Sequence, residues 1–334
     1  MLKKIFMCLM SILFFVNSSY AYGSELLIFN ELKLINKDGK KFKKIITNKK
    51  FSISEQALKN INDYKNNIKN SHNKNIKVLF SSNVSETIKK EELSLIQDGL
   101  KFFQDYYYID DLNGVIFTSD DIEWADNIIK NNIHSGWFGN IKKSYNKNEV
   151  CNFAFSMQQY GYAVCIDNQN RKIFDKQTSI HEIFHTVQAQ NSNVPKSNNF
   201  GMPCWLLEGS ATYLGSSIGI QDLSHMNIFI NNLKHQFKDN QNNNILSKLK
   251  SKDAKIIMRN LESTESCDLT LAPYTMGYLA TEILISKYGF EKFMIFIQSF
   301  NNNVDWKKDF ELIFDLNIDL FYGQVIDHAN NSLS

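Results

Sequence analysis

The sequence has little proline, no excess of charge of either sign and no long apolar run after its first residues. Only 3 prolines occur among 334 residues, so the position of each is informative. Loss of an N-terminal segment containing Lys3 and Lys4 would reduce the 37 basic residues to 35, equal to the 35 acidic ones. A formal charge of about zero gives no indication of a nucleic-acid partner. Without a second long apolar run, we expect no membrane span in the mature chain.

The first 21 residues have the pattern of a cleavable signal peptide. Lys3 and Lys4 precede an apolar run from Ile5 to Val16, and Ser19-Tyr20-Ala21 offers small residues for cleavage. The run is too short to cross a bilayer comfortably. We therefore expect cleavage after Ala21 and a secreted or periplasmic protein.

Four cysteines follow this segment, at Cys151, Cys165, Cys204 and Cys267. In an oxidising compartment an even number allows two disulfides, with three possible connectivities. Sequence order favours Cys151–Cys165 and Cys204–Cys267, and four buried free thiols are the alternative. Thiol titration with and without reductant distinguishes these possibilities.

The region after the signal segment is expected to form a hairpin and a helix. Residues 25–50 place apolar stretches on both sides of Asp38-Gly39, a favoured two-residue hairpin turn. Residues 54–70 then have the composition of a polar helix. The function of this extension, including a role as a propeptide, is left open by the sequence.

From residue 75 the pattern changes to alternating strands and helices. The expected elements are strands at 76–80 and 115–117, helices at 86–107 and 120–129, and two short strands at 150–155 and 162–166. This order favours a twisted sheet backed by helices. Farther along, helices are expected at 175–190, around Glu208, and at 223–237, 254–261, 274–288, 290–300 and 305–329.

The chemistry is predicted around the motif His181-Glu182-Ile183-Phe184-His185. Residues four apart on a helix share one face, so His181 and His185 can direct both imidazoles at one point. This spacing is that of a zinc site, in which the intervening Glu182 acts on a metal-bound water.

A third ligand must come from elsewhere, and Glu208 on a following helix is the predicted donor. Two histidines and one carboxylate leave a fourth position for water, as catalytic zinc sites do. Pro203 precedes this helix and Pro273 precedes a later one, in agreement with the tolerance of proline at helix starts. A structural site with Cys204 as fourth ligand is the alternative, but it would leave Glu182 unexplained.

These segments resemble those of the gluzincin metallopeptidases, whose third zinc ligand is a glutamate on a helix after the HExxH helix. The resemblance covers about residues 175–290 and includes Trp205-x-x-Glu208-Gly209-x-Ala211-x-Tyr213 and Tyr274-x-x-Gly277. It implies an α+β, zincin-like, two-lobed fold with an N-terminal twisted sheet and a mainly helical C-terminal lobe. The corresponding divisions are a signal peptide at 1–21, an extension at 22–72, an α/β lobe at 73–191 and a helical lobe at 192–334.

The resemblance also implies a role for each residue. His181, His185 and Glu208 would hold Zn²⁺, which lowers the pKa of a bound water and polarises the scissile carbonyl. Glu182 would take the proton from this water and deliver it to the leaving amine.

A tyrosine on a later helix often stabilises the oxyanion in gluzincins, and Tyr274 matches that pattern. Tyr278, one turn farther on, is an alternative, and a simple packing role for Tyr274 is another. A Cys204–Cys267 bridge would tie the Glu208 helix to the segment that leads into Tyr274.

The sequence departs from better-known gluzincins in two respects. No carboxylate occurs between Gly209 and Gln221 to orient a zinc-bound histidine, so Thr212, Ser216 or an acid from elsewhere must do so. The exopeptidase motif Gly-x-Met-Glu-Asn is absent, and residues 151–165 contain no acid to bind a free amine. An endopeptidase is therefore favoured over an aminopeptidase.

The sequence thus favours a zinc-dependent endopeptidase acting on peptide or protein substrates. One alternative is a zincin-fold binding or assembly module without turnover. Another is a zinc hydrolase of a non-peptide amide, such as a cell-wall linkage. Zinc content, together with cleavage of an unstructured protein, would separate an active enzyme from a binding module.

Overall fold

The computed structural model describes two compact units, Met1–Lys50 and Phe51–Ser334. The residues described are 34–35, 41–42, 51–68, 75–107, 111–133, 151, 153–167, 173–192, 201–220, 231–232, 248–263, 267, 271–302 and 305–333. In the first unit, β1 (Leu34–Ile35) pairs antiparallel with β2 (Lys41–Phe42), as expected for a hairpin. The predicted turn at Asp38-Gly39 and the predicted signal segment at 1–21 lie outside the described residues.

The second unit contains a mixed four-stranded sheet with the order β3-β4-β6-β5. Three strands are parallel, and the fourth is antiparallel to its neighbour β6. The strands are β3 (Asn75–Phe80), β4 (Asp111–Phe117), β5 (Ala154–Ser156) and β6 (Gly161–Cys165). This arrangement agrees with the strand positions expected from the sequence and gives an α+β fold.

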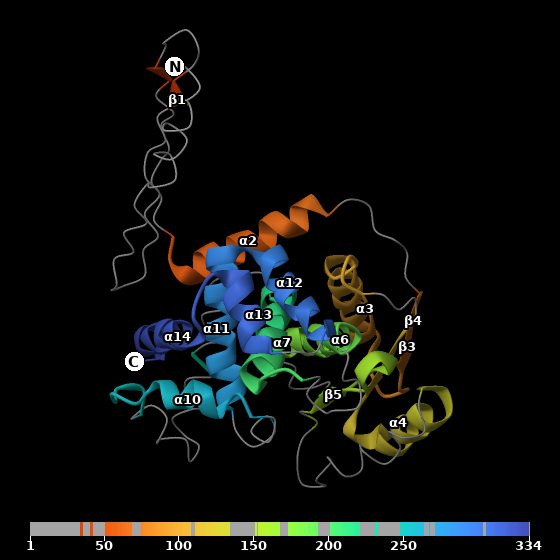
Figure 1. Ribbon diagram of the computed structural model, residues 1–334. Helices are drawn as coiled ribbons and strands as arrows, with labels where there is room; N and C mark the ends of the chain where they lie inside the picture. Colours follow the sequence, from red (N-terminus) through yellow and green to blue (C-terminus); the bar gives the residue numbers. More distant parts are fainter. Residues whose placement is uncertain are drawn as a thin grey trace, which may run out of the picture. The chain divides into compact units, whose positions relative to one another are not determined.

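Helices are the main elements of the second unit (Figure 1). The α-helices are α2 (Ile53–Asn67), α3 (Glu86–Phe102), α4 (Ile122–Ile128), α6 (Thr178–Gln190), α7 (Cys204–Gly219), α10 (Lys255–Asn260), α11 (Ala272–Tyr288), α12 (Phe290–Ser299), α13 (Trp306–Phe314) and α14 (Ile318–Leu333). The expected helix at 223–237 falls almost entirely outside the described residues.

The largest difference from a predicted helix boundary is at the end of α3, which ends at Phe102 rather than at Tyr107. Beyond it the backbone changes to tighter i to i−3 hydrogen bonds, including one from Tyr106 N to Phe103 O at 2.8 Å. These turns bury Phe103 and Tyr107 in the core. Apolar spacing continues through such turns, so the sequence pattern did not reveal where the helix stops.

The two faces of the sheet pack against different helices. Side chains alternate along a strand, so one set joins the large core with α3 and α6, and the other packs against α4. The first set comprises Leu112, Ile116, Tyr162 and Val164, and the second comprises Val115, Phe117, Ala163 and Cys165. The sheet is therefore covered on both faces, with α6 on the same side as α3.

Helices α7 and α11 cross in direct backbone contact at two glycines. A methyl group added to Gly209 would lie 2.1 Å from the backbone of Gly277. One added to Gly277 would lie 2.0 Å from the carbonyl oxygen of Trp205. Neither overlap could be relieved by moving a side chain, so glycine at both positions sets the separation of the two helices.

The two helix-associated prolines that the structure describes lie at helix starts, as predicted. Pro203 is the N-cap residue of α7, and Pro273 lies in the first turn of α11. Pro195 lies outside the described residues.

Helix α2 belongs to the second unit and packs across α11 and α12 (Figure 1). It begins with a capping box, in which Ser52 and Glu55 exchange hydrogen bonds. The Asn60 amide donates to the carbonyl oxygens of Ile285 at 2.7 Å and Ser286 at 3.2 Å. These carbonyls lie in the last turn of α11, where Ile285 O also accepts from the amide of the C-cap residue Gly289 at 3.0 Å.

The predicted disulfide pairing is confirmed. Cys151–Cys165 and Cys204–Cys267 are both bonded, with Cα–Cα distances of 5.2 and 5.1 Å. The first joins the end of β6 to the chain before β5, and the second holds the first residue of α7.

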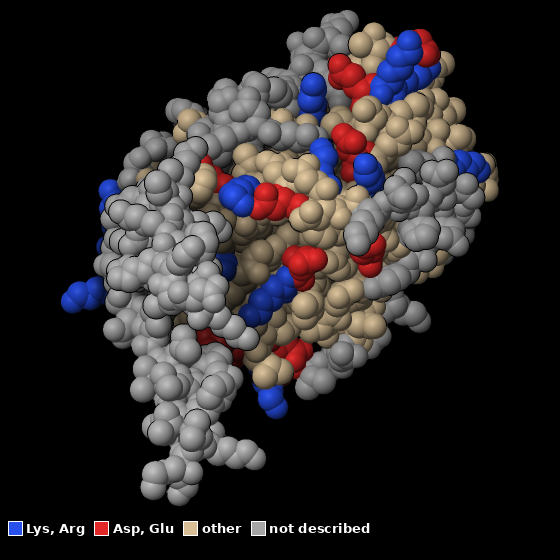
Figure 2. Space-filling view, turned by 90° about the horizontal axis from the view of Figure 1, so that it is seen from above, with Lys and Arg blue, Asp and Glu red and all other residues tan. Residues whose placement is uncertain are grey.

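The described surface is mixed in charge. On the face seen in Figure 2, lysine and arginine side chains alternate with aspartate and glutamate side chains among larger uncharged areas. Within the described ranges, no helix combines the length and apolar character needed to cross a membrane.

Candidate metal centre

The HExxH motif lies on α6, one of the most buried helices of the second unit. Every residue from Ser179 to Ala189 is buried. Ile180, Phe184 and Val187 pack into the large core. His181 and His185 occupy another side of the same helix, toward α7, so the core contacts of α6 fix the direction in which both imidazoles point.

Glu208 of α7 meets the two histidines, as predicted. Its Oε2 atom lies 3.3 Å from His181 Nε2 and 3.4 Å from His185 Nε2. The two Nε2 atoms are 3.0 Å apart. Three buried ligand atoms thus form a nearly equilateral triangle, which could hold a metal ion.

The dimensions of this triangle fit the coordination of zinc. Zinc bonds to nitrogen and oxygen are about 2.0–2.1 Å long, and a tetrahedron with such bonds has edges of about 3.3 Å. The observed separations of 3.0, 3.3 and 3.4 Å lie close to that edge. Neutral imidazole and carboxylate are also ligand types that zinc accepts.

The three groups attract one another electrostatically even without a metal. Burial alone would lower the pKa of His185, but Glu208, with smaller contributions from Glu182 and Gln188, outweighs burial and raises that pKa to about 9. Burial would raise the pKa of Glu208, but His185 and His181 hold it well below its ordinary value. A buried cation binding here must therefore compete with a proton on His185.

Glu182 is buried next to this triangle, and its Oε2 atom has no hydrogen-bond partner. Burial raises the pKa of Glu182, the two histidines lower it, and Glu208 raises it again, with a net increase. A buried carboxylate with an open oxygen and a raised pKa is suited to accept a proton from a bound molecule.

Gln188 holds the other side of the His185 ring. His185 Nδ1 lies 2.7 Å from Gln188 Oε1. The Gln188 amide nitrogen donates to the Leu207 carbonyl oxygen and to Ser210 Oγ, each at 3.0 Å. No role for Gln188 was predicted from the sequence, although its position three after His185 places it on the same side of α6.

Thr212 is the residue beside the other histidine. Its hydroxyl lies 3.4 Å from His181 Nδ1 and donates to the Glu208 carbonyl oxygen at 2.7 Å. Of the groups considered from the sequence, Thr212 is therefore in place to orient His181. Ser216 donates instead to the Tyr213 carbonyl oxygen at 2.9 Å.

Tyr274 lies beside the triangle, and Tyr278 lies in the core. The Tyr274 ring is nearly parallel to that of His181, with ring centroids 6.1 Å apart. The Tyr278 ring packs edge-on against Tyr213 at 5.1 Å and is fully buried. The structure thus favours Tyr274 over Tyr278 as a residue of the site.

Glycines bring α6 and α7 close enough for these contacts. A methyl group on Gly215 would lie 2.9 Å from the Gln177 carbonyl oxygen and 3.3 Å from His181 Cβ. Together with the crossing at Gly209 and Gly277, this close approach sets the positions of the Glu208 and Tyr274 helices relative to the histidines. Cys204, the fourth ligand of the alternative structural site, is bonded to Cys267.

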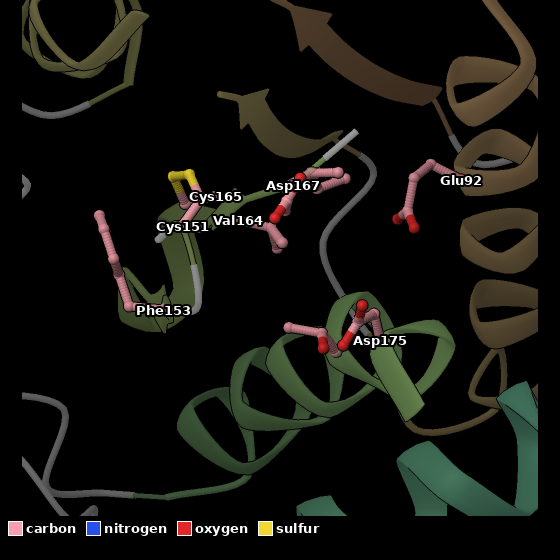
Figure 3. A pocket seen from close by; sticks show the side chains of 9 residues that line it. Glu92, Cys151, Phe153, Val164, Cys165, Asp167 and Asp175 are labelled. Carbon is pink, nitrogen blue, oxygen red and sulfur yellow. A yellow bond between two sulfur atoms is a disulfide. The ribbon is translucent and has the colours of Figure 1, made fainter. Parts of the chain in front are cut away.

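A separate pocket opens beside the start of α6 (Figure 3). Its lining contains the Cys151–Cys165 disulfide and the carboxylates of Glu92, Asp167 and Asp175, but none of the three clustered ligand residues. Glu92 projects into it from α3 and accepts a hydrogen bond from Ser179. This bond connects α3 to the first turn of α6.

Comparisons with protein-family models, with curated proteins and with solved structures found no match.

Proposed function

We propose that this protein is a secreted or periplasmic zinc-dependent endopeptidase of gluzincin type. The observation that carries the proposal is the triangle of His181 Nε2, His185 Nε2 and Glu208 Oε2, with edges of 3.0–3.4 Å. Glu182, with its open carboxylate oxygen, lies in the same buried site. A metal held by three side chains, with a base beside it, is the arrangement of a catalytic rather than a structural site.

A bound zinc ion would supply Lewis acidity and lower the pKa of a coordinated water to about 7. Glu182 would accept the proton of the attacking water as the water oxygen forms a bond to the carbonyl carbon. Glu182 then gives the proton to the amide nitrogen as the carbon–nitrogen bond breaks, so that a carboxylic acid and an amine are released. The raised pKa of Glu182 makes it a stronger base for the first of these transfers.

Tyr274 is proposed to donate its hydroxyl hydrogen bond to the oxyanion that develops on the substrate carbonyl. Support comes from its ring, which stacks beside His181 at 6.1 Å and is only partly buried. Tyrosine donates a hydrogen bond without carrying charge, so it would interact most strongly when negative charge appears on the oxygen.

The edge of the sheet favours a peptide over other amides. β5 is the terminal strand of the four-stranded sheet and contacts α6. Among the described residues, no strand pairs with its outer edge. An extended peptide can add to such an edge through backbone hydrogen bonds, close to the helix that carries the histidines.

The proposal assigns the sheet with α3, α4 and α6 to one lobe of a zincin-like fold and the helices from α7 onward to the other. Two disulfides support an oxidising compartment. The predicted signal peptide at 1–21 would deliver the chain there.

The test compares the wild-type protein with Glu182→Gln in digestion of a library of proteome-derived peptides. We expect Glu182→Gln to retain zinc at one ion per chain and to lose activity by at least about a thousandfold, because the general base is removed. Glu92→Gln, a buried carboxylate outside the ligand cluster, serves as the matched control. Full activity of zinc-loaded Glu182→Gln would disprove the mechanism. Zinc binding by the wild type without cleavage of any peptide would instead favour the binding module.

A further inference from the structure

We propose that Gln188 is the positioning residue of the metal centre, and that it fixes the His185 ring relative to the helix that carries Glu208. The inference rests on the metal site of the proposed function and adds a determinant of metal affinity to it. Mutation of the residue that hydrogen-bonds a metal-binding histidine commonly lowers metal affinity by about 10–100-fold. In this chain the partner is a neutral amide.

The hydrogen bonds define which way the Gln188 amide points. The Ser210 hydroxyl donates its hydrogen to the Leu206 carbonyl oxygen, so toward Gln188 it can only accept. The Leu207 carbonyl oxygen is also an acceptor. The group facing both must be the amide nitrogen, and the amide oxygen consequently faces His185.

This orientation defines the state of the His185 ring. Because an amide oxygen only accepts, His185 Nδ1 must carry the hydrogen in the 2.7 Å contact. The neutral ring then has its lone pair on Nε2, which lies 3.0 Å from His181 Nε2 and 3.4 Å from Glu208 Oε2. Gln188 therefore presents the ring nitrogen that a metal requires.

The same side chain couples the two ligand-bearing helices. Its donors reach Leu207 and Ser210, which flank Glu208 on α7. Gln188 and Ser210 are fully buried, so water cannot replace these bonds. A shift of α7 that displaced Glu208 would also break the contacts of the residue that orients His185.

His181 has a weaker connection of this kind. The Thr212 hydroxyl is 3.4 Å from His181 Nδ1, at the long limit of a hydrogen bond. We therefore assign the main positioning role to Gln188, and we expect Thr212→Val to weaken zinc binding less than Gln188→Leu does.

The test measures the zinc dissociation constant of the full chain by competition with a chromophoric chelator. Gln188→Leu and Gln188→Glu both remove the donor to Leu207, but only Gln188→Leu removes the acceptor for His185 Nδ1. A positioning role predicts affinity at least about tenfold weaker in Gln188→Leu, with Gln188→Glu at wild-type strength or tighter. Gln190→Leu, at the end of α6 and on a different side of the helix, is the matched control.

Equal loss of affinity in Gln188→Leu and Gln188→Glu would show that Gln188 only joins the helices, and would overturn the inference. Melting of the metal-free variants establishes whether each is folded. Nitrogen-15 spectra of histidine in the zinc-loaded wild type give a second measurement that needs no variant. They should show His185 bound through Nε2 with a slowly exchanging Nδ1 proton; binding through Nδ1 would also overturn the inference. A wild type that binds no zinc would refute the proposed function instead.

Discussion

His185 and Glu208 form a buried ion pair at the position where a metal would bind. The pKa of His185 is raised from its ordinary value of 6.5 to about 9, and that of Glu208 is lowered. In the metal-free protein the charge on His185 therefore contributes stability fully below pH 6.5. This contribution is lost as the pH rises through 9.

Zinc must displace the proton of this pair, because a metal binds only neutral imidazole. At pH 7.5 we expect the binding of one zinc ion to release about one proton from His185. Calorimetry in buffers with different ionisation enthalpies measures that number. In Glu208→Gln the pKa of His185 should fall, and any residual binding should release less than one proton. Zinc binding to the wild type with no proton release would contradict the assigned ion pair.

The clustering of His181, His185 and Glu208 was predicted from the sequence, and the hydrogen-bond partners of the histidines only in part. The i, i+4 spacing of His181 and His185 is a local property of one helix, so it survives any packing arrangement. Gln188 matters because α7 places Leu207 and Ser210 against it. That contact depends on how α6 and α7 pack together, which cannot be derived from the spacing of residues along one helix.

Among the contacts between helices near the site, the crossing of α7 and α11 is the closest. Both helices carry a residue of the proposed mechanism within one turn of the contact, Glu208 beside Gly209 and Tyr274 three before Gly277. Side chains at the crossing would separate the helices and move these two residues apart. Gly209 and Gly277 are thus explained by the close approach of the backbones of α7 and α11 at these positions.

Gly277→Ala should reduce the free energy of unfolding by about 3 kcal/mol or more, because the added methyl overlaps backbone rather than a movable side chain. Urea denaturation of the zinc-free protein measures the change. Gly323→Ala in α14 is the control: its methyl would lie 3.3 Å from the flexible end of Lys255. Because alanine has a higher helix propensity than glycine, Gly323→Ala should leave the free energy of unfolding unchanged or increase it by up to about 1 kcal/mol. Similar changes in the free energy of unfolding for Gly277→Ala and Gly323→Ala would argue against direct backbone contact at the crossing of α7 and α11.

Most elements of the second unit were predictable because their signals are local. Short apolar runs at 115–117 and 162–166 identified β4 and β6, and proline with helical spacing identified the starts of α7 and α11. The predicted end of α3 was wrong, because Phe103 and Tyr107 keep a helix-like apolar spacing in turns that are not α-helical. Which face of the sheet each helix covers also could not be derived, since it depends on the chain connections.

Two disulfides constrain the second unit as a whole. Cys204–Cys267 spans 63 residues and holds the start of α7, whereas Cys151–Cys165 spans 14 residues near the end of β6. A longer closed loop restricts the unfolded chain more strongly. The bridge at α7 should therefore be the more stabilising of the two.

Replacing both cysteines of each pair by alanine tests this order. We expect a loss of about 4 kcal/mol for Cys204→Ala with Cys267→Ala, and about 3 kcal/mol for Cys151→Ala with Cys165→Ala, on the chain-entropy estimate. Chemical denaturation of the two double variants gives the values. Removal of both partners avoids a free thiol in either variant. A larger loss at the shorter bridge would mean that local packing outweighs loop entropy.

The position of α2 has a consequence for the order in which the chain can fold during synthesis. Asn60 hydrogen-bonds to Ile285, 225 residues later in the chain. At roughly 5–20 residues per second, a ribosome needs about 10–45 s to make the intervening segment. Throughout that interval Ala57, Leu58 and Ile61 have no α11 to cover them. Synthesis of α11 therefore has to precede docking of α2. The second unit is accordingly expected to fold after its synthesis rather than progressively from its N-terminus.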